Sequence, residues 1–425
     1  MIKKKLINLL FLLIPFSYIA GNLFINLNIF LIAILGLIFY GKDLLKINFI
    51  FIDKLILFLF GFFLLNASYN HIADNYLGSE NINYIIIKTA LYFRYLFFYI
   101  VTRYLVEKKL INFKFFLISC LASCLFVSLD ITFQLIFGKD IFGYEAVTRK
   151  LSGPFGDEWI AGGFLQRFAP LGLYAIPFFF KDSNAKNLIF FSTVTFLLVL
   201  VAIILSGNRM PLVLFLFVIF LLFIFENKLR KYLLKIALIS AISIFSVYNL
   251  SFEYKTQFDG FITHGKKISK AFITKEVDMM TRATTHYAEF ESFYDTWLMN
   301  KYTGGGIRSF RINCPYRENI ELEERSTCNT HPHNYYLEIL TDSGLVGLTI
   351  IVLIFSLIFY TSFIKKYFTN SNLLLKSNYI LTPFIFLFIA EIFPIKSTGS
   401  FFTTHNSAYI FFLMAVIVGF SKQKG

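Results

Sequence analysis

The residues best suited to chemistry stand where a long polar stretch meets an apolar run, in segment 331–338, His-Pro-His-Asn-Tyr-Tyr-Leu-Glu. Asn334 is a favoured N-cap residue, so we expect a helix to begin there. His333 would then lie at the boundary between water and membrane, beside the positive helix end that keeps its imidazole neutral. A neutral imidazole there can accept the proton of a substrate hydroxyl. The alternative is that His333 is only an interfacial polar residue.

A second candidate is Arg209, which stands in a short polar turn between two apolar runs, Ser-Gly-Asn-Arg-Met-Pro at 206–211. Pro211 is favoured early in a helix, so Arg209 should open one. A guanidinium beside the free N–H groups of a helix start is a strong site for phosphate. The alternative is an arginine whose long side chain simply extends to the interface.

Other charged residues are supporting candidates. Arg282 and Arg308 lie in the longest polar segment, where each could bind a second phosphate or be a solvated charge. Arg149 belongs to a glycine-rich loop. Arg167 stands several residues inside an apolar run, and the same holds for Glu338; charges within a span are expensive and usually functional, so we expect Arg167 to face an internal cavity.

The polar segment also holds Cys314 and Cys328, which could form a disulfide if the segment lies outside the cytoplasm. The sequence has no HExxH motif and no Cys/His cluster with zinc spacing, so we expect no metal site. It also has no P-loop and no dinucleotide fingerprint, so we expect no cofactor.

The composition indicates that membrane-spanning segments position these residues. The chain has 425 residues, of which 57% are hydrophobic and 16% charged, against about 25% charged in soluble domains. Its mean hydropathy is +0.66. These values exclude a soluble globular enzyme. The net charge of +14 comes from Lys and Arg in short gaps between apolar runs, which is typical of membrane topology and argues against nucleic-acid binding.

Apolar runs predict an all-α polytopic membrane protein with about twelve transmembrane helices. Each must be helical because lipid offers the backbone no hydrogen-bond partner. The runs lie at about 6–20, 23–40, 51–66, 84–105, 113–137, 161–180, 187–206, 209–225, 232–250, 336–363, 378–394 and 403–420.

Alternating charge in the gaps sets the orientation. Lysines at positions 3 to 5 indicate a cytoplasmic N-terminus, and twelve crossings return the C-terminus to the cytoplasm. We therefore predict a membrane domain of nine helices (1–250), one large loop outside the cytoplasm (251–335) and three further helices (336–425). An amphipathic helix is expected within the loop over about 277–300.

Three of these elements together resemble the O-antigen ligase and O-antigen polymerase (Wzy-type) superfamily of bacterial membrane glycosyltransferases. They are the Ser-Gly-x-Arg setting of Arg209, the helix led by Arg282 after the ninth span, and His-Asn-x-Tyr-Leu from His333, followed by Gly-Leu-x-Gly-Leu from Gly344. The resemblance covers residues from about 140 to 360.

This resemblance implies a GT-C-like, metal-independent, inverting glycosyltransferase of the bacterial inner membrane. The donor would be a glycan on undecaprenyl pyrophosphate at the periplasmic face, and the acceptor a sugar hydroxyl of the lipid A core or another glycan. His333 would activate the hydroxyl, while Arg209 and Arg282 would hold the pyrophosphate. Asp342 stands where many relatives carry Glu, and His331 offers a second imidazole.

Two alternatives remain. A Wzy-type polymerase joining lipid-linked repeats typically uses two arginine-bearing outside loops, and Arg149 with Lys150 could supply one of them. A transporter or flippase would show charges through many spans and matching broken helices in its two halves, which the sequence does not show.

Overall fold

The computed structural model describes residues 2–73, 82–146, 150–180, 185–230, 232–250, 252–274, 285–317, 328, 332–369, 379–396 and 399–423. Within these ranges the regular structure is helical without any strand, and one isolated antiparallel bridge joins Lys139 to Glu145. The predicted all-α class is therefore confirmed.

The helices follow the predicted apolar runs closely in order. Their bounds are α1 (Ile2–Ala20), α2 (Asn22–Leu44), α3 (Phe51–Ile72), α4 (Ile82–Glu107), α5 (Phe113–Phe137), α6 (Ala161–Leu173), α7 (Ala185–Leu205), α8 (Arg209–Phe225), α9 (Asn227–Arg230), α10 (Leu233–Tyr248), α11 (Phe252–Thr274), α13 (Thr285–Leu298), α14 (Phe310–Asn313), α15 (Tyr335–Phe359), α16 (Lys365–Tyr367), α18 (Leu381–Glu391) and α19 (Thr404–Ser421).

Seven helices in the described part of the chain are long and apolar enough to cross a membrane. They are Asn22–Leu44, Phe51–Ile72, Asn83–Glu107, Phe113–Phe137, Ala185–Leu205, Tyr335–Tyr367 and Thr404–Ser421. An eighth is reached if the pair Leu234–Tyr248 and Phe252–Lys267, bent by 115°, is one span. Helices α8 and α18 are apolar but shorter. A multi-span membrane protein is thus supported, whereas the count of twelve stays a prediction.

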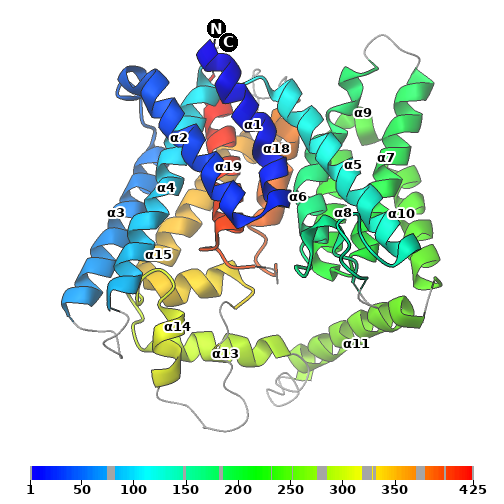
Figure 1. The fold of residues 1–425 in the computed structure, drawn as a ribbon. Helices are drawn as coiled ribbons and strands as arrows, with labels where there is room; N and C mark the ends of the chain where they lie inside the picture. Colours follow the sequence, from blue (N-terminus) through cyan, green and yellow to red (C-terminus); the bar gives the residue numbers. More distant parts are fainter. Residues whose placement is uncertain are drawn as a thin grey trace.

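The helices stand side by side as a bundle whose two chain ends lie at the same end (Figure 1). Helices α11 and α13 run crosswise at the opposite end, roughly perpendicular to the bundle (Figure 1). Helix α13 falls within the predicted amphipathic helix at 277–300, whose first part lies outside the described residues. The prediction that this loop faces the periplasm is compatible with this arrangement and stays a prediction.

The core is centred on α19, which is buried along almost its whole length and packs against α4 and α18. Aromatic side chains fill much of this core; Phe412, for example, packs against Phe98 and Phe116. Peripheral helices leave apolar side chains exposed, such as Leu65 and Phe190. Such outward apolar faces are stable only against lipid.

Helix α15 differs from the uninterrupted span predicted at 336–363. Its backbone leaves helical geometry at Gly344, where φ is 64° and ψ is −170°. A short segment, 335–343, therefore precedes a longer one that continues through a π-helical turn at Tyr360–Ile364. Only glycine adopts this conformation readily, because it has no Cβ.

The loop at 301–306 fills the interruption in α15. The N–H of Leu345 donates to Lys301 O and that of Val346 to Tyr302 O, both at 3.0 Å. In return, Gly306 N donates to Asp342 O at 2.8 Å. Backbone groups released by the break are thus paired with the loop, as a buried backbone requires. This loop includes the three consecutive glycines at 304–306, which follow the amphipathic helix predicted at 277–300.

Candidate active site

His333 lies immediately before α15, half-buried, with a left-handed backbone (φ 52°). Histidine is one of the few residues other than glycine that adopt this region with some frequency. The predicted cap follows: Asn334 is the N-cap, and its Oδ1 accepts from Tyr336 N at 2.9 Å and Leu337 N at 3.2 Å. The imidazole therefore belongs to a residue adjoining a capped, positive helix end.

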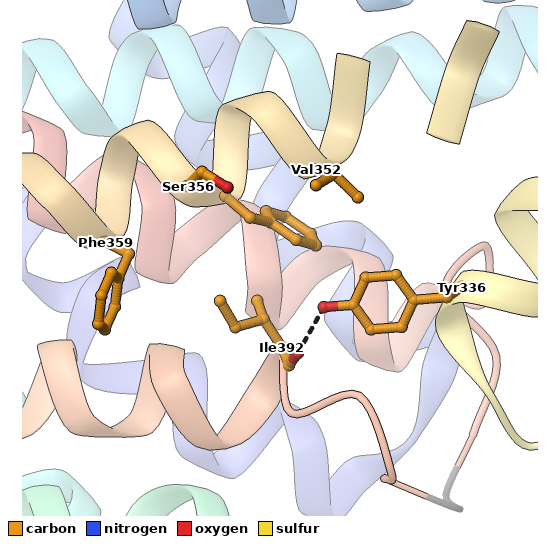
Figure 2. Close-up of a pocket in the computed structure, with 6 residues that line it drawn as sticks. Tyr336, Val352, Ser356, Phe359 and Ile392 are labelled. Carbon is orange, nitrogen blue, oxygen red and sulfur yellow. Dashed lines mark hydrogen bonds between the residues drawn. The ribbon is translucent and has the colours of Figure 1, made fainter. Parts of the chain in front are cut away.

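The start of α15 is fastened to the chain that follows α18. Asn334 Nδ2 donates to Pro394 O at 2.9 Å, and Tyr336 Oη donates to Ile392 O at 2.5 Å (Figure 2). An open apolar pocket of about 270 Å³ adjoins this last bond. Its lining residues are Tyr336, Val352, Phe355, Ser356, Phe359 and Ile392 (Figure 2).

Glu338 is buried in the first turns of α15. Its carboxylate accepts hydrogen bonds from Ser400 Oγ and Phe401 N. Both donors belong to the segment that precedes α19. Glu338 therefore joins α15 to that segment and helps to hold the helix start, and its role in binding a glycan stays a prediction.

Arg308 follows the loop at 301–306 by two residues, and it too has a left-handed backbone (φ 65°). Its N–H donates to Asp342 Oδ2 at 2.6 Å, and its Nη2 donates to Phe402 O at 3.1 Å. Asp342 also accepts from Ser309 Oγ and Phe310 N. The carboxylate at 342 thus organises the loop, and part of the Arg308 guanidinium already has a carbonyl partner.

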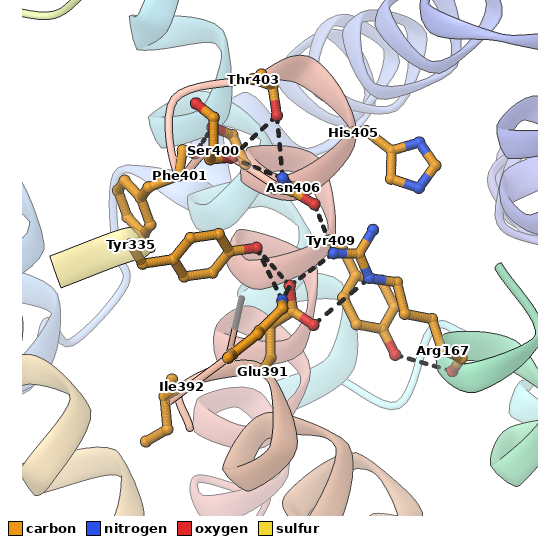
Figure 3. A network of polar contacts seen from close by, with 12 residues as sticks. Arg167, Tyr335, Glu391, Ile392, Ser400, Phe401, Thr403, His405, Asn406 and Tyr409 are labelled. Atoms are coloured by element: carbon orange, nitrogen blue, oxygen red, sulfur yellow. Dashed lines mark hydrogen bonds and ion pairs between the residues drawn. The ribbon is translucent and has the colours of Figure 1, made fainter. Parts of the chain in front are cut away.

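Arg167 is buried in α6, but the expectation that it faces an internal cavity is not met. Its Nη2 lies 2.8 Å from Glu391 Oε1 and also donates to Asn406 Oδ1 (Figure 3). The physical reason is that a buried guanidinium is stable only when paired, and Glu391 at the end of α18 supplies the charge. Arg167 is therefore a structural ion-pair partner in this conformation.

Arg209 is the first residue of α8, as predicted, and its side chain lies close to Gly260 of α11. A Cβ placed on Gly260 of α11 would be 3.6 Å from Arg209 Nη2. A small pocket at this point is lined by Ile204, Gly207, Asn208, Arg209, Leu212, Val213 and Phe258. The preceding Asn208 is held by a bond from its Nδ2 to Trp159 O at 2.6 Å.

A second cation stands near Arg209. Lys150 lies with its Nζ 4.5 Å from the centre of the Trp159 ring. Partial burial, with a smaller contribution from the positive charge of Arg209, lowers the pKa of Lys150. The positive charge of Arg209 disfavours the charged form of Lys150, and a nearby anion would offset this effect.

Cys314 and Cys328 are joined by a disulfide, with their Cα atoms 5.7 Å apart. Arg317 Nη1 donates to Cys314 O at 2.8 Å beside it. The bond connects the end of α14 to a residue five positions before His333. It therefore limits how far the segment leading to His333 can move from the loop at 301–313.

The structure thus brings some candidates together. Asn334, Glu338 and Arg308 lie around the start of α15, and Arg167 reaches the same helix through Glu391. Arg209 stands apart from them in sequence, at the start of α8. Three candidates, Arg149, Arg282 and His331, lie outside the described residues.

Lys396 was missed by the sequence analysis. It is buried, with its Nζ 2.6 Å from Glu391 Oε1 and 3.1 Å from Tyr335 Oη. A signal was available, because Lys396 follows an apolar run at an end predicted to lie outside, against the usual bias of charges.

Comparison with known proteins gives one family. Residues 194–352 match the family model described as O-antigen ligase. The match confirms the resemblance to the O-antigen ligase and polymerase superfamily, and the matched segment holds both Arg209 and His333. No curated protein matches the chain.

Proposed function

Because residues 194–352 carry the features of the O-antigen ligase family, we propose that this chain is an O-antigen ligase-like glycosyltransferase. It would move a glycan from undecaprenyl pyrophosphate to a sugar hydroxyl of the lipid A core, at the periplasmic face of the inner membrane. The observation that carries the proposal is the family match over the segment that contains both Arg209 and His333. The apolar pocket beside Tyr336 is suited to hydrocarbon, from a lipid-linked donor or from bilayer lipid alike.

His333 is the proposed general base. The acceptor hydroxyl oxygen forms a bond to the anomeric carbon while the bond from that carbon to the pyrophosphate oxygen breaks. The hydroxyl proton passes to the imidazole, and undecaprenyl pyrophosphate leaves. The adjoining helix start favours the neutral imidazole that this step requires. Direct displacement of this kind inverts the anomeric centre.

Arg209 and Arg282 are the proposed ligands of the pyrophosphate. A pyrophosphate is already a good leaving group, so cations aimed at the charge that develops on it lower the barrier without a metal. Arg209, with Lys150 close by, provides such a concentration of positive charge. The proposed reaction is therefore independent of metal ions.

A Wzy-type polymerase is the second candidate. The observation that favours it is the proximity of Lys150, from the loop at 138–160, to Arg209 at the start of α8. Two basic elements from two outside loops are what a polymerase of this superfamily would use. The donor and the chemistry would be the same, and the acceptor would be another lipid-linked repeat.

The lipopolysaccharide profile of a deletion strain separates the two functions. A ligase predicts loss of all long chains together with accumulation of lipid-linked polymer. A polymerase predicts a single repeat on the core. Complementation with His333→Ala should fail although the protein inserts normally, while His71→Ala, a histidine at the end of α3, should complement. Complementation by His333→Ala would remove His333 as the base.

Metal independence is tested with purified protein and lipid-linked donor in the presence of EDTA. We expect transfer to continue at its original rate. A strict requirement for an added divalent cation would contradict the role proposed for the arginines.

A further inference from the structure

Three charged side chains form a buried cluster between the ends of several helices. Arg167 Nη2 and Lys396 Nζ lie 2.8 and 2.6 Å from the same oxygen, Glu391 Oε1. The three side chains are 7%, 4% and 0% exposed, in the order Arg167, Lys396, Glu391. Burying charges is costly, so removing one member leaves an unpaired charge and perturbs what the cluster contacts.

The cluster reaches the residues beside His333 through hydrogen bonds. Tyr335 is the first residue of α15, and its Oη donates to Glu391 Oε1 at 2.6 Å. Lys396 Nζ donates to the same Tyr335 Oη at 3.1 Å. Figure 3 shows Tyr335 and Arg167 approaching Glu391 from opposite sides. The two residues that flank Tyr335 also bond to carbonyls of the 392–394 segment, so three consecutive residues of the helix start are fixed to it.

The 391–396 segment is itself anchored elsewhere. Arg167 brings α6 to Glu391, and it donates to Asn406 of α19. Asn406 Nδ2 in turn donates to Ser400 O at 2.7 Å. Two helices far apart in sequence, α6 and α19, thus help to fix where the segment lies, and the segment fixes where α15 begins.

We propose that Lys396 is a positioning residue for the transfer reaction: by bridging Glu391 and Tyr335 it sets the direction in which α15 starts, and so the place of His333. This inference rests on the proposed function of His333. Lys396 touches no reacting atom in this account. Its effect is on the rate, because a general base displaced by about 1 Å loses roughly a hundredfold in efficiency.

The pH dependence of the transfer rate tests this inference. Burial of Lys396 lowers its pKa from 10.5 to about 8. The groups that face it are Glu391 of α18, Tyr335 of α15, Arg167 of α6 and His405 of α19. As the pH rises through about 8 the lysine loses its charge and the bridge weakens. The transfer rate should therefore decline above this pH.

The titration of Lys396 does not itself destabilise the folded protein in this pH range. Between pH about 8 and 10.5 the unfolded chain binds more protons at Lys396 than the folded chain does. Stability rises with pH wherever the unfolded state binds more protons. Titration of Lys396 therefore raises the free energy of unfolding over the pH range in which the transfer rate should fall. A loss of rate can thus be distinguished from a loss of stability.

The experiment measures pH–rate profiles and thermal stability of the full chain in nanodiscs with a polyprenyl-pyrophosphate-linked glycan donor. Lys396→Met should lower kcat about tenfold or more at neutral pH with little change in donor KM. Lys396→Arg should restore kcat at neutral pH and remove the decline above pH 8, because arginine stays charged there. Lys108→Met, an exposed lysine at the other end of the bundle, is the matched control and should behave as wild type.

Two results would overturn the inference: a normal kcat in Lys396→Met, or the same alkaline decline in Lys396→Arg as in wild type. If Lys396→Met fails to fold, the profile of Lys396→Arg still decides. A second readout needs no turnover: in a His333→Cys background, the maleimide labelling rate should change on adding Lys396→Met. An active His333→Ala variant would instead refute the proposed function, whatever the lysine variants do.

Discussion

The break in α15 makes Gly344→Ala the sharpest test of how the helix start is built. A Cβ at this position would overlap the carbonyl of Tyr302 and crowd Thr303 N, which are backbone atoms that no rotamer change can move. The backbone at 344 also occupies a region that is nearly exclusive to glycine. The substitution must therefore displace the loop or force the helix to close.

The expected loss in free energy of unfolding for Gly344→Ala has two contributions. Holding a residue with a Cβ in this backbone region costs about 1 to 3 kcal/mol. Displacing the loop removes the bonds from Leu345 N and Val346 N to the loop carbonyls, at about 0.5 to 1.5 kcal/mol each. The expected loss in free energy of unfolding is therefore roughly 2 to 6 kcal/mol.

The assay is unfolding of the purified protein in mixed micelles by titration with SDS, with transfer activity measured alongside. Gly61→Ala is the matched control, because a Cβ at position 61 of α3 meets no atom within 4 Å. We expect Gly344→Ala to unfold at much lower SDS and to lose activity, while Gly61→Ala resembles wild type. Equal transitions for the two variants would show that the interruption at 344 is not required.

Three further outcomes are expected. Arg209→Lys should reduce transfer by about 10- to 100-fold, since a charge-assisted bond worth about 1.5 to 3 kcal/mol is lost with the guanidinium; unchanged steady-state kinetics would make Arg209 an interfacial charge only. Replacing Cys314 and Cys328 together by Ser, which opens a link across 14 positions, should lower stability by about 3 kcal/mol, and dithiothreitol should then have no additional effect in thermal melts. Asn334→Ala should cost about 1 kcal/mol because both cap bonds disappear, whereas Asn334→Asp should keep the cap and lose only the bond to Pro394; a melt of Asn334→Ala identical to wild type would argue against the cap.

The sequence predicted those features that depend on neighbouring residues. Apolar runs gave the helices because the membrane leaves a continuous run few other structures. The cap at Asn334 was predictable because it needs only a short side chain at a helix start. The position of Arg209 at the start of α8 followed in the same way from Pro211, two residues later.

Features that depend on distant parts of the chain were not predictable. Arg167 looked like a residue facing a cavity, because its partner Glu391 is 224 positions away in sequence. The interruption at Gly344 was hidden because its hydrogen-bond partners belong to the loop at 301–306. Lys396 could have been noticed as a charge in an unusual place, but its contact with Tyr335 required the fold. The periodicity of apolar residues indicates the helix to which a residue belongs, but it gives no information on contacts between helices.

The exchange of backbone bonds between 301–306 and 341–346 also has a consequence for biosynthesis. The earlier segment is synthesised first, so it exists before the later one can complete its bonds with it. Before these bonds form, the N–H groups of Leu345 and Val346 lack these carbonyl partners. Unpaired backbone N–H groups are energetically costly in lipid. Residues 301–306 are therefore synthesised before the part of α15 to which they bond. A fusion protein that carried α15 without residues 301–306 would leave Leu345 N and Val346 N without these carbonyl partners.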